Sequence, residues 1–219
     1  MGQTSSTPSD RWPYLLNFTS DIYSIANNTL TCEELGIRYR IYTPPRERIL
    51  TLTDDRITSI YRLDHETQRE ILVAQLDNRS HKRHVRIAPG TGLDAPGLEA
   101  PFVRVKEYFP NVSKWRTKRG FRASNGREYF WRIYDGRLHR SDDKSEPIAK
   151  FSEARLFGSP MHIKLTNECL DILDEIVVTC LIAEQKRRDQ SSCLRESSQS
   201  AGASAGAASA SAAAAAAAA

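Results

Sequence analysis

The most continuous apolar pattern of the chain lies near its C-terminal end and has the spacing of a buried helix. Within residues 167–189, apolar side chains cover most of the circumference of a helix with about 3.6 residues per turn. Asp171, Asp174 and Glu175 leave one narrow polar stripe, which is confined to the first half. A helix that is apolar nearly all round has to be enclosed by other elements, so the pattern predicts a core helix here.

The two ends of this stretch carry residues that suit the two poles of a helix. Asn167 is a favourable N-cap, and Lys186, Arg187 and Arg188 complement the negative C-terminal pole. A membrane-spanning helix needs roughly 18 or more mainly apolar residues, whereas the uncharged run 176–183 is much shorter. The pattern therefore favours a buried core helix over a membrane span.

Most of the chain before this helix alternates in the manner of short β-strands. Runs rich in β-branched and aromatic residues are separated by Pro, Gly, Asp or Asn at short intervals. Residues 11–28 are also too apolar for a free linker, and two placements remain open for them: packing across the outside of the domain, or a short helix after Ser20 or Asp21. The predicted strands occupy residues 37–43, 49–53, 57–63, 70–76, 84–88, 102–105, 120–124, 127–134, 137–140, 148–151 and 161–165.

The clearest local signal is a meander of three or four antiparallel strands between residues 115 and 151. Asn125-Gly126 is the dipeptide most typical of a two-residue hairpin and predicts a type I′ turn, in which both residues have positive φ. Asp135-Gly136 predicts a second turn. The strand between the two turns has aromatic residues on both faces, so both faces are expected to be at least partly covered.

The order of many strands followed by one wholly apolar helix predicts the fold class. It is mainly β, an α+β arrangement in which an antiparallel β-barrel or strongly curled sheet encloses the C-terminal hydrophobic helix. We expect a disordered arm over residues 1–10, a single domain over 11–189, and a disordered Ser/Gly/Ala-rich tail over 190–219.

Composition adds little beyond an ordinary soluble domain. The net charge is +4, with 26% charged and 40% hydrophobic residues. The four cysteines, Cys32, Cys169, Cys180 and Cys193, include no CxxC pair, which argues against a zinc site or a disulfide framework. Residues 1–10 lack the apolar segment of a signal peptide, so we expect an intracellular, cytoplasmic protein.

Several segments resemble an uncharacterised family of fungal proteins, the domain-of-unknown-function 6593 family. The segments are 39–44 (YRIYTP), 121–132 (FRASNGREYFWR), 149–151 (AKF), and 173–179 (LDEIVVT) with Glu184 and Lys186 to Arg188. The likeness runs from about residue 35 to 188, and departs from the family pattern at Cys180-Leu181 and in the loop 89–101. The family carries no established catalytic or binding residues, so the resemblance implies a fold and transfers no site.

The order of elements also resembles the tubby-like barrel shared by tubby proteins, phospholipid scramblases and plant LURP-one-related proteins. In that architecture a barrel of strands encloses a C-terminal hydrophobic helix. The resemblance implies a tubby-like fold for this chain. It raises lipid as a candidate ligand but is no argument for a particular function, because one fold serves many functions.

The sequence contains no motif of an established reaction class, such as GxSxG, HExxH or a Gly-rich phosphate loop. His81 and His84 are surrounded by Lys and Arg, which lower the affinity of a histidine for metal ions. Asp142-Asp143 has the character of a turn and lacks the further ligands of a calcium loop. We therefore predict no enzyme, no metal site and no cofactor.

Positive charge is concentrated between Arg104 and Arg140, where eleven Lys or Arg and three acidic residues give a net charge of +8. Basic side chains interleaved with aromatic ones suit anionic lipid headgroups or nucleic acid, and lipid ranks first because hairpin aromatics more often face a core. Alternatively, strand alternation simply places half of these cations on a solvated face. The candidate anion-binding residues are Lys114, Trp115, Arg116, Lys118, Arg119 and Arg122.

A second membrane signal lies at the start of the sequence, where Gly2 and Ser6 fit the pattern for N-myristoylation. One myristoyl chain gives only marginal binding, so it would act together with the basic cluster. We expect a monomeric, non-catalytic intracellular module that binds peripherally to anionic lipids or docks a protein partner through its basic face. A structural or protein-interaction domain without lipid affinity is the alternative.

Overall fold

The computed structural model describes residues 11–19, 27–45, 57–63, 68–77, 83–87, 101–115, 117–153 and 160–190. The predicted arm at 1–10, the tail beyond 190 and the predicted strand at 49–53 lie outside these residues. The strands are β1 (Tyr14–Phe18), β2 (Asn28–Cys32), β3 (Ile37–Tyr42), β4 (Ile57–Leu63), β5 (Glu70–Asp77), β6 (His84–Ile87), β7 (Val103–Arg104), β8 (Lys118–Arg122), β9 (Glu128–Arg132), β10 (Arg137–Arg140), β11 (Ala149–Ser152) and β12 (His162–Leu165).

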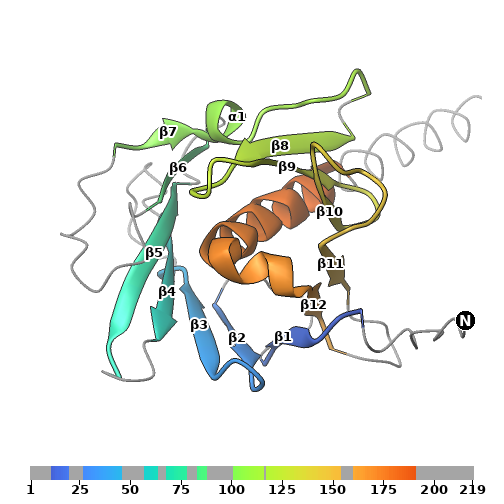
Figure 1. Cartoon of the computed structure of the whole chain (residues 1–219). Helices are drawn as coiled ribbons and strands as arrows, with labels where there is room; N and C mark the ends of the chain where they lie inside the picture. The colour runs from blue at the N-terminus through green and yellow to red at the C-terminus, as the bar shows by residue number, and fades with distance from the viewer. Residues whose placement is uncertain are drawn as a thin grey trace, which may run out of the picture.

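The twelve strands form one antiparallel sheet in the order β7-β6-β5-β4-β3-β2-β1-β12-β11-β10-β9-β8. Strands that follow one another in the chain are neighbours, except β7 and β8, which stand at the two ends of this order. The pairing of β1 with β12 joins the two meanders. The sheet curls around a helix that lies inside it (Figure 1). The predicted mainly-β class and the meander between residues 115 and 151 are confirmed.

The N-terminal strand β1 corrects the placement of residues 11–28 across the outside of the domain, whereas the alternative, a short helix after Ser20 or Asp21, lies outside the described residues. Residues Tyr14 to Phe18 lie in the middle of the sheet, where Leu16 stands opposite Ile163 of β12. Leu16 and Phe18 alternate with less buried residues and point into the core. Because this alternation covers only five residues, the pattern alone could not separate a strand from an amphipathic turn.

The sheet does not close into a barrel, because its outer strands β7 and β8 do not pair with each other among the described residues. The segment that connects β7 to β8 fills the gap between these two strands, which we call the seam. Its short helix α1 (Val105–Tyr108) begins where β7 ends, and Asn111 forms a bridge with Arg119 of β8. Val105 and Phe109 are buried beneath this seam. The curled-sheet form of the prediction therefore holds, and the closed barrel does not.

The core helix is enclosed as predicted. A 3₁₀ segment, η1 (Asn167–Ile172), leads into an α-helix that covers residues 173–190. Ile176, Val177 and Val178 have no exposed surface. The helical segment opens with Thr166 as N-cap, without a side-chain cap bond, so the expected cap at Asn167 is wrong by one residue. In the described part of the chain, no helix is long and apolar enough to cross a membrane.

Asp174 and Glu175 of the polar stripe bond to the surrounding strands and turns, whereas Asp171 is exposed. Asp174 accepts a hydrogen bond from the Tyr39 hydroxyl at 2.5 Å and forms an ion pair with Arg62 at 2.9 Å. Glu175 accepts from the backbone N–H of Ser124 at 3.0 Å. Burial raises the pKa of Asp174 despite these partners. The stripe therefore fixes how the helix is rotated inside the sheet.

The aromatic strand β9 holds the middle of the helix through one buried hydrogen bond. The Trp131 indole N–H donates to the Thr179 hydroxyl at 2.9 Å, and that hydroxyl donates to the Glu175 carbonyl at 2.6 Å. Both side chains are almost completely buried. A buried indole N–H without a partner is unfavourable, so this bond fixes the position of the helix relative to β9.

The turn at Asn125-Gly126 is not the predicted type I′ turn. Gly126 has φ of +78°, but Asn125 is not among the described residues with positive φ. Gly126 N–H donates to the Ala123 carbonyl at 2.9 Å, the pattern of a type I turn followed by a left-handed glycine. The Asn125 side chain accepts from the Arg127 N–H and donates to the Tyr129 hydroxyl, which accounts for its different conformation.

We predict that Thr179→Val, which keeps the side-chain shape, lowers the free energy of unfolding by about 1–3 kcal/mol, because it leaves the Trp131 N–H buried without a partner. Thr179→Ser keeps the hydroxyl and should lose only about 1 kcal/mol for the missing methyl group. Denaturant unfolding measures both values. The indole N–H resonance of Trp131 should move in the Val variant and stay in place in the Ser variant.

A second prediction compares two glycines that both have positive φ. A Cβ at Gly126 would meet nothing within 4 Å, so Gly126→Ala should cost only the left-handed strain, about 1 kcal/mol. A Cβ at Gly136 would lie 2.8 Å from the Phe151 carbonyl oxygen, so Gly136→Ala should cost clearly more. Equal denaturation midpoints for the two variants would contradict this assignment.

Candidate functional site

The structure divides the predicted basic cluster between the two faces of the sheet. In the register of β8 with β9, Lys118 stands opposite Arg132, whereas Arg119 stands opposite Trp131, which faces the helix. Lys118 and Arg122 therefore point outward and Arg119 points inward. Lys114 and Trp115 lie in the exposed turn before β8, and Arg116 lies outside the described residues.

Arg119 is half-buried and points toward the inner face of the sheet. Its guanidinium donates to the Phe109 carbonyl at 3.4 Å, under the seam of the sheet. It also lies close enough to Lys186 of the helix to contribute, after burial, to a lowered pKa of that lysine. The predicted set of six residues is therefore not one continuous patch.

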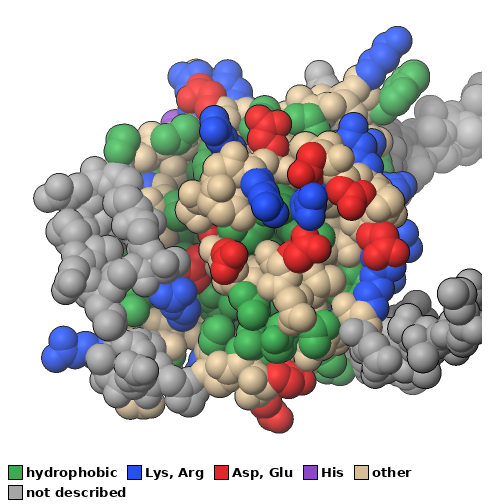
Figure 2. All heavy atoms as spheres, viewed as in Figure 1, with side chains coloured by type: hydrophobic (Ala, Val, Ile, Leu, Met, Phe, Trp, Pro, Cys, Tyr) green, Lys and Arg blue, Asp and Glu red, His purple; other side chains and the backbone are tan. Residues whose placement is uncertain are grey.

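A different set of cations does form a continuous row on the outer face. Lys118 of β8 pairs with Arg132 of β9, which pairs with Arg137 of β10. Arg137 pairs in turn with Lys150 of β11, and Lys150 with Lys164 of β12. Neighbouring strands lie about 4.8 Å apart, so this cation row is about 19 Å long. In Figure 2, Lys and Arg side chains lie along the right-hand edge of the view, with Asp and Glu side chains beside some of them.

The cation row is largely uncompensated by acidic side chains. Within the described residues, the one ion pair formed by its members joins Arg132 to Asp135 at 3.1 Å. The Lys118 ammonium lies 5.1 Å from the centre of the Phe130 ring, a cation–π contact. Like charges directly opposite each other destabilise a sheet, so each pair in the row is unfavourable in the absence of an anion.

Sequence reasoning missed four of the five members because they are far apart along the chain. Arg132 and Arg137 flank the predicted turn at Asp135-Gly136 symmetrically, so hairpin pairing about that turn could have placed them side by side. Lys150 and Lys164 needed the pairing of β11 with β10 and β12, which no local pattern reveals.

Exposed aromatic side chains lie beside one end of the cation row. Trp115 is 79% exposed and Tyr134 is 66% exposed. The Ile133 N–H donates to the Thr117 carbonyl, which brings the turn that carries Trp115 next to the end of β9. The Lys114 ammonium lies 5.8 Å from the Trp115 ring. This aromatic corner joins apolar surface to positive charge at one edge of the molecule.

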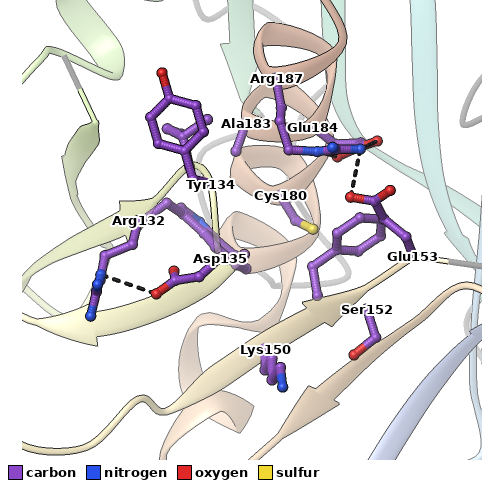
Figure 3. Close-up of a pocket in the computed structure, with 14 residues that line it drawn as sticks. Arg132, Tyr134, Asp135, Lys150, Ser152, Glu153, Cys180, Ala183, Glu184 and Arg187 are labelled. Carbon is purple, nitrogen blue, oxygen red and sulfur yellow. Dashed lines mark hydrogen bonds and ion pairs between the residues drawn. The ribbon is translucent and has the colours of Figure 1, made fainter. Parts of the chain in front are cut away.

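A pocket of about 370 Å³ lies between the β9–β10 turn, the end of β11 and the last turns of the helix. Arg132 and Lys150 of the cation row are among its lining residues. Figure 3 shows the Arg132–Asp135 pair on one side of the pocket, the Arg187–Glu153 pair on the other, and Cys180 between them.

The charged groups of this pocket are mostly engaged with one another. Arg187 forms ion pairs with Glu153 and with the buried Glu184, each at 2.7 Å. Burial, with Glu184 nearby, raises the pKa of the Cys180 thiol well above its ordinary value. A thiol held in its protonated form is a poor nucleophile, so the arrangement suits binding better than covalent chemistry. The described residues contain no group of three or more side chains that could hold a metal ion.

We predict that Lys150→Glu stabilises the folded protein by about 0.2–1 kcal/mol at low salt, because Lys150 stands between Arg137 and Lys164 in the row. The gain should shrink in high salt, which screens exposed charges. Chemical denaturation at two salt concentrations measures it. Lys106→Glu, on the exposed face of α1, serves as the control and should not stabilise. A destabilised Lys150→Glu protein would contradict the like-charge interpretation.

Comparison with known proteins gives one family match. The profile of DUF6593, described as a family of unknown function, matches residues 23–189. No curated protein and no solved structure matches the chain.

Proposed function

The chain belongs to DUF6593, a family of unknown function, and we propose that it is a non-catalytic intracellular module that attaches peripherally to anionic membrane surfaces. The observation that carries the proposal is the cation row, five Lys or Arg in register across five neighbouring strands. A row about 19 Å long meets several headgroups of a lipid surface at once. Each cation near an anionic leaflet contributes about 1 kcal/mol of attraction.

The aromatic corner supports the same orientation on a membrane. Trp and Tyr are enriched where membrane meets water, because they combine an apolar ring with a polar atom. Trp115 and Tyr134 lie at the end of the row formed by Lys118 and Arg132. In the proposed orientation the row rests on the headgroups while these two rings enter the interface.

Two finer elements of the proposal go beyond the site. The curled sheet around a hydrophobic helix is proposed to be a tubby-like arrangement in which the seam segment takes the place of the last strand pairing. Gly2, which lies outside the described residues, is proposed to carry a myristoyl group that adds a second weak anchor. Mass spectrometry of the protein from its native cells tests the acyl group directly, and Gly2→Ala should shift it away from membranes.

Vesicle sedimentation of the full chain tests the membrane proposal. Wild-type protein should bind vesicles that contain phosphatidylserine, should bind pure phosphatidylcholine weakly, and should lose binding as salt rises. The double variant Lys150→Glu/Lys164→Glu should weaken binding more than about tenfold, because two cations become anions. Trp115→Ala should weaken binding without changing its salt dependence.

The matched control is Arg38→Glu/Lys106→Glu, which changes the same total charge on exposed residues that are not part of β8 to β12. This control should bind almost as well as the wild-type protein. If both double variants lost vesicle binding equally, binding would depend on the net charge of the protein and not on the position of the cation row. Binding that ignores lipid charge and salt would sink the membrane proposal, and a protein partner docked on the basic face would replace it.

A further inference from the structure

We propose that the β8–β10 end of the cation row is a phosphate-binding site built around His139, with Lys118, Arg132 and Arg137 as its cationic ligands, and that phosphate binding is coupled to protonation of His139. This inference rests on the proposed anionic-surface function and names the chemical group that the surface recognises. It does not depend on whether the phosphate belongs to a lipid or is free in solution.

The outer face of the sheet contains an unusual buried histidine. His139 points to the outer face, because its neighbour Leu138 in β10 faces the core, and yet His139 is only 4% exposed. Its ring stacks on Phe130 with centroids 5.4 Å apart and planes 10° from parallel. Neither ring nitrogen has a hydrogen-bond partner within the described residues. Buried polar atoms are nearly always paired, so the ring lacks an interaction that its position calls for.

Cations surround this ring from three strands. Lys118 of β8 contacts the Phe130 ring that stacks on His139. Arg132 of β9 and Arg137 of β10 form the next outward-facing pair beyond the Phe130–His139 pair. Asp135, in the turn between β9 and β10, is the acidic group near the ring. Burial, followed by Arg132, lowers the pKa of His139 below its ordinary value.

A phosphate group fits this arrangement better than a carboxylate. Its several oxygens can accept bonds from donors on three separate strands and from an imidazole N–H, whereas a carboxylate has two oxygens. Arg132 is already paired with Asp135, so Lys118 and Arg137 leave about two uncompensated positive charges. A phosphomonoester carries about −1.5 to −2 charges at neutral pH, which matches them. Lys118 and Arg137 are half-buried and Arg132 is exposed, so their long side chains can rearrange around the anion.

The coupling to protons follows from the same charges. Burial and then Arg132 lower the pKa of His139, so the free folded protein disfavours the charged ring, and the contribution of the neutral ring to stability is lost as the pH falls through that lowered pKa. A bound anion offsets Lys118, Arg132 and Arg137 and favours the charged imidazolium, so it raises the pKa of His139. Anion affinity should therefore increase as the pH falls, by up to about tenfold per pH unit between the two pKa values.

The test follows the His139 ring by NMR in the full chain while inorganic phosphate is added at several pH values. Sulfate, which keeps the same charge across this range, separates proton uptake by His139 from titration of the phosphate itself. Both anions should shift the ring resonances and raise the midpoint of the His139 titration. His139→Gln keeps a donor without a titrating group, so anion binding should persist and lose its pH dependence. Lys118→Ala/Arg137→Ala should abolish the response.

A vesicle arm separates the two sources of phosphate and the two proposals. At matched lipid charge, phosphatidic acid, which has a phosphomonoester, should bind more tightly than phosphatidylserine, and the difference should vanish in Lys118→Ala/Arg137→Ala. A His139 ring that ignores phosphate and sulfate, in protein that still binds anionic vesicles, overturns this inference and leaves the membrane proposal standing. A clear phosphate response without vesicle binding identifies a site for free phosphate compounds and overturns the membrane proposal instead.

Discussion

A helix with apolar side chains on every side has to be surrounded, and the rest of this structure depends on that constraint. Ile176, Val177 and Val178 are completely buried, and a flat sheet covers a helix from one direction only. The sheet meets the requirement by joining two meanders through β1 and β12 and curling until both outer strands contact one connecting segment. Polar groups of the helix then bond to the inner face, as Thr179 does with Trp131.

The same constraint decides where ligands can bind. Every second residue of each strand faces the helix, so the inner face has no room for a ligand-binding surface. Lys118 and Arg119 are adjacent in sequence, yet one faces solvent and the other lies under the seam. Function is therefore left to the outer face, to the seam and to the pocket where the helix leaves the sheet, and the cation row and His139 both lie on the outer face.

Sequence reasoning succeeded where the pattern is local and failed where pairing is remote. The helix at 167–189 and the meander at 115–151 follow from apolar periodicity and turn residues, and both are present. β1 was missed because five alternating residues carry too little signal, and the open seam was missed because β7 pairs over only two residues. The cation row was missed for a similar reason. A patch judged by closeness in sequence mixes the two faces of a strand, and Lys150 and Lys164 join the row only through strand order.

The outer face combines two arrangements that weaken an isolated sheet. Like charges stand opposite each other across four strand pairs. Neutral polar residues would fit such partly exposed positions equally well. His139 is buried among these cations, and no hydrogen-bond partner for its ring nitrogens is found in the described part of the chain. In the proposal above, an anion bound at the β8–β10 end of the row offsets Lys118, Arg132 and Arg137 and accepts a bond from the His139 imidazole, so it relieves both arrangements at that end. In the same proposal, the large buried core stabilises the protein enough to tolerate these cations in the free state, and a bound anion lowers their cost.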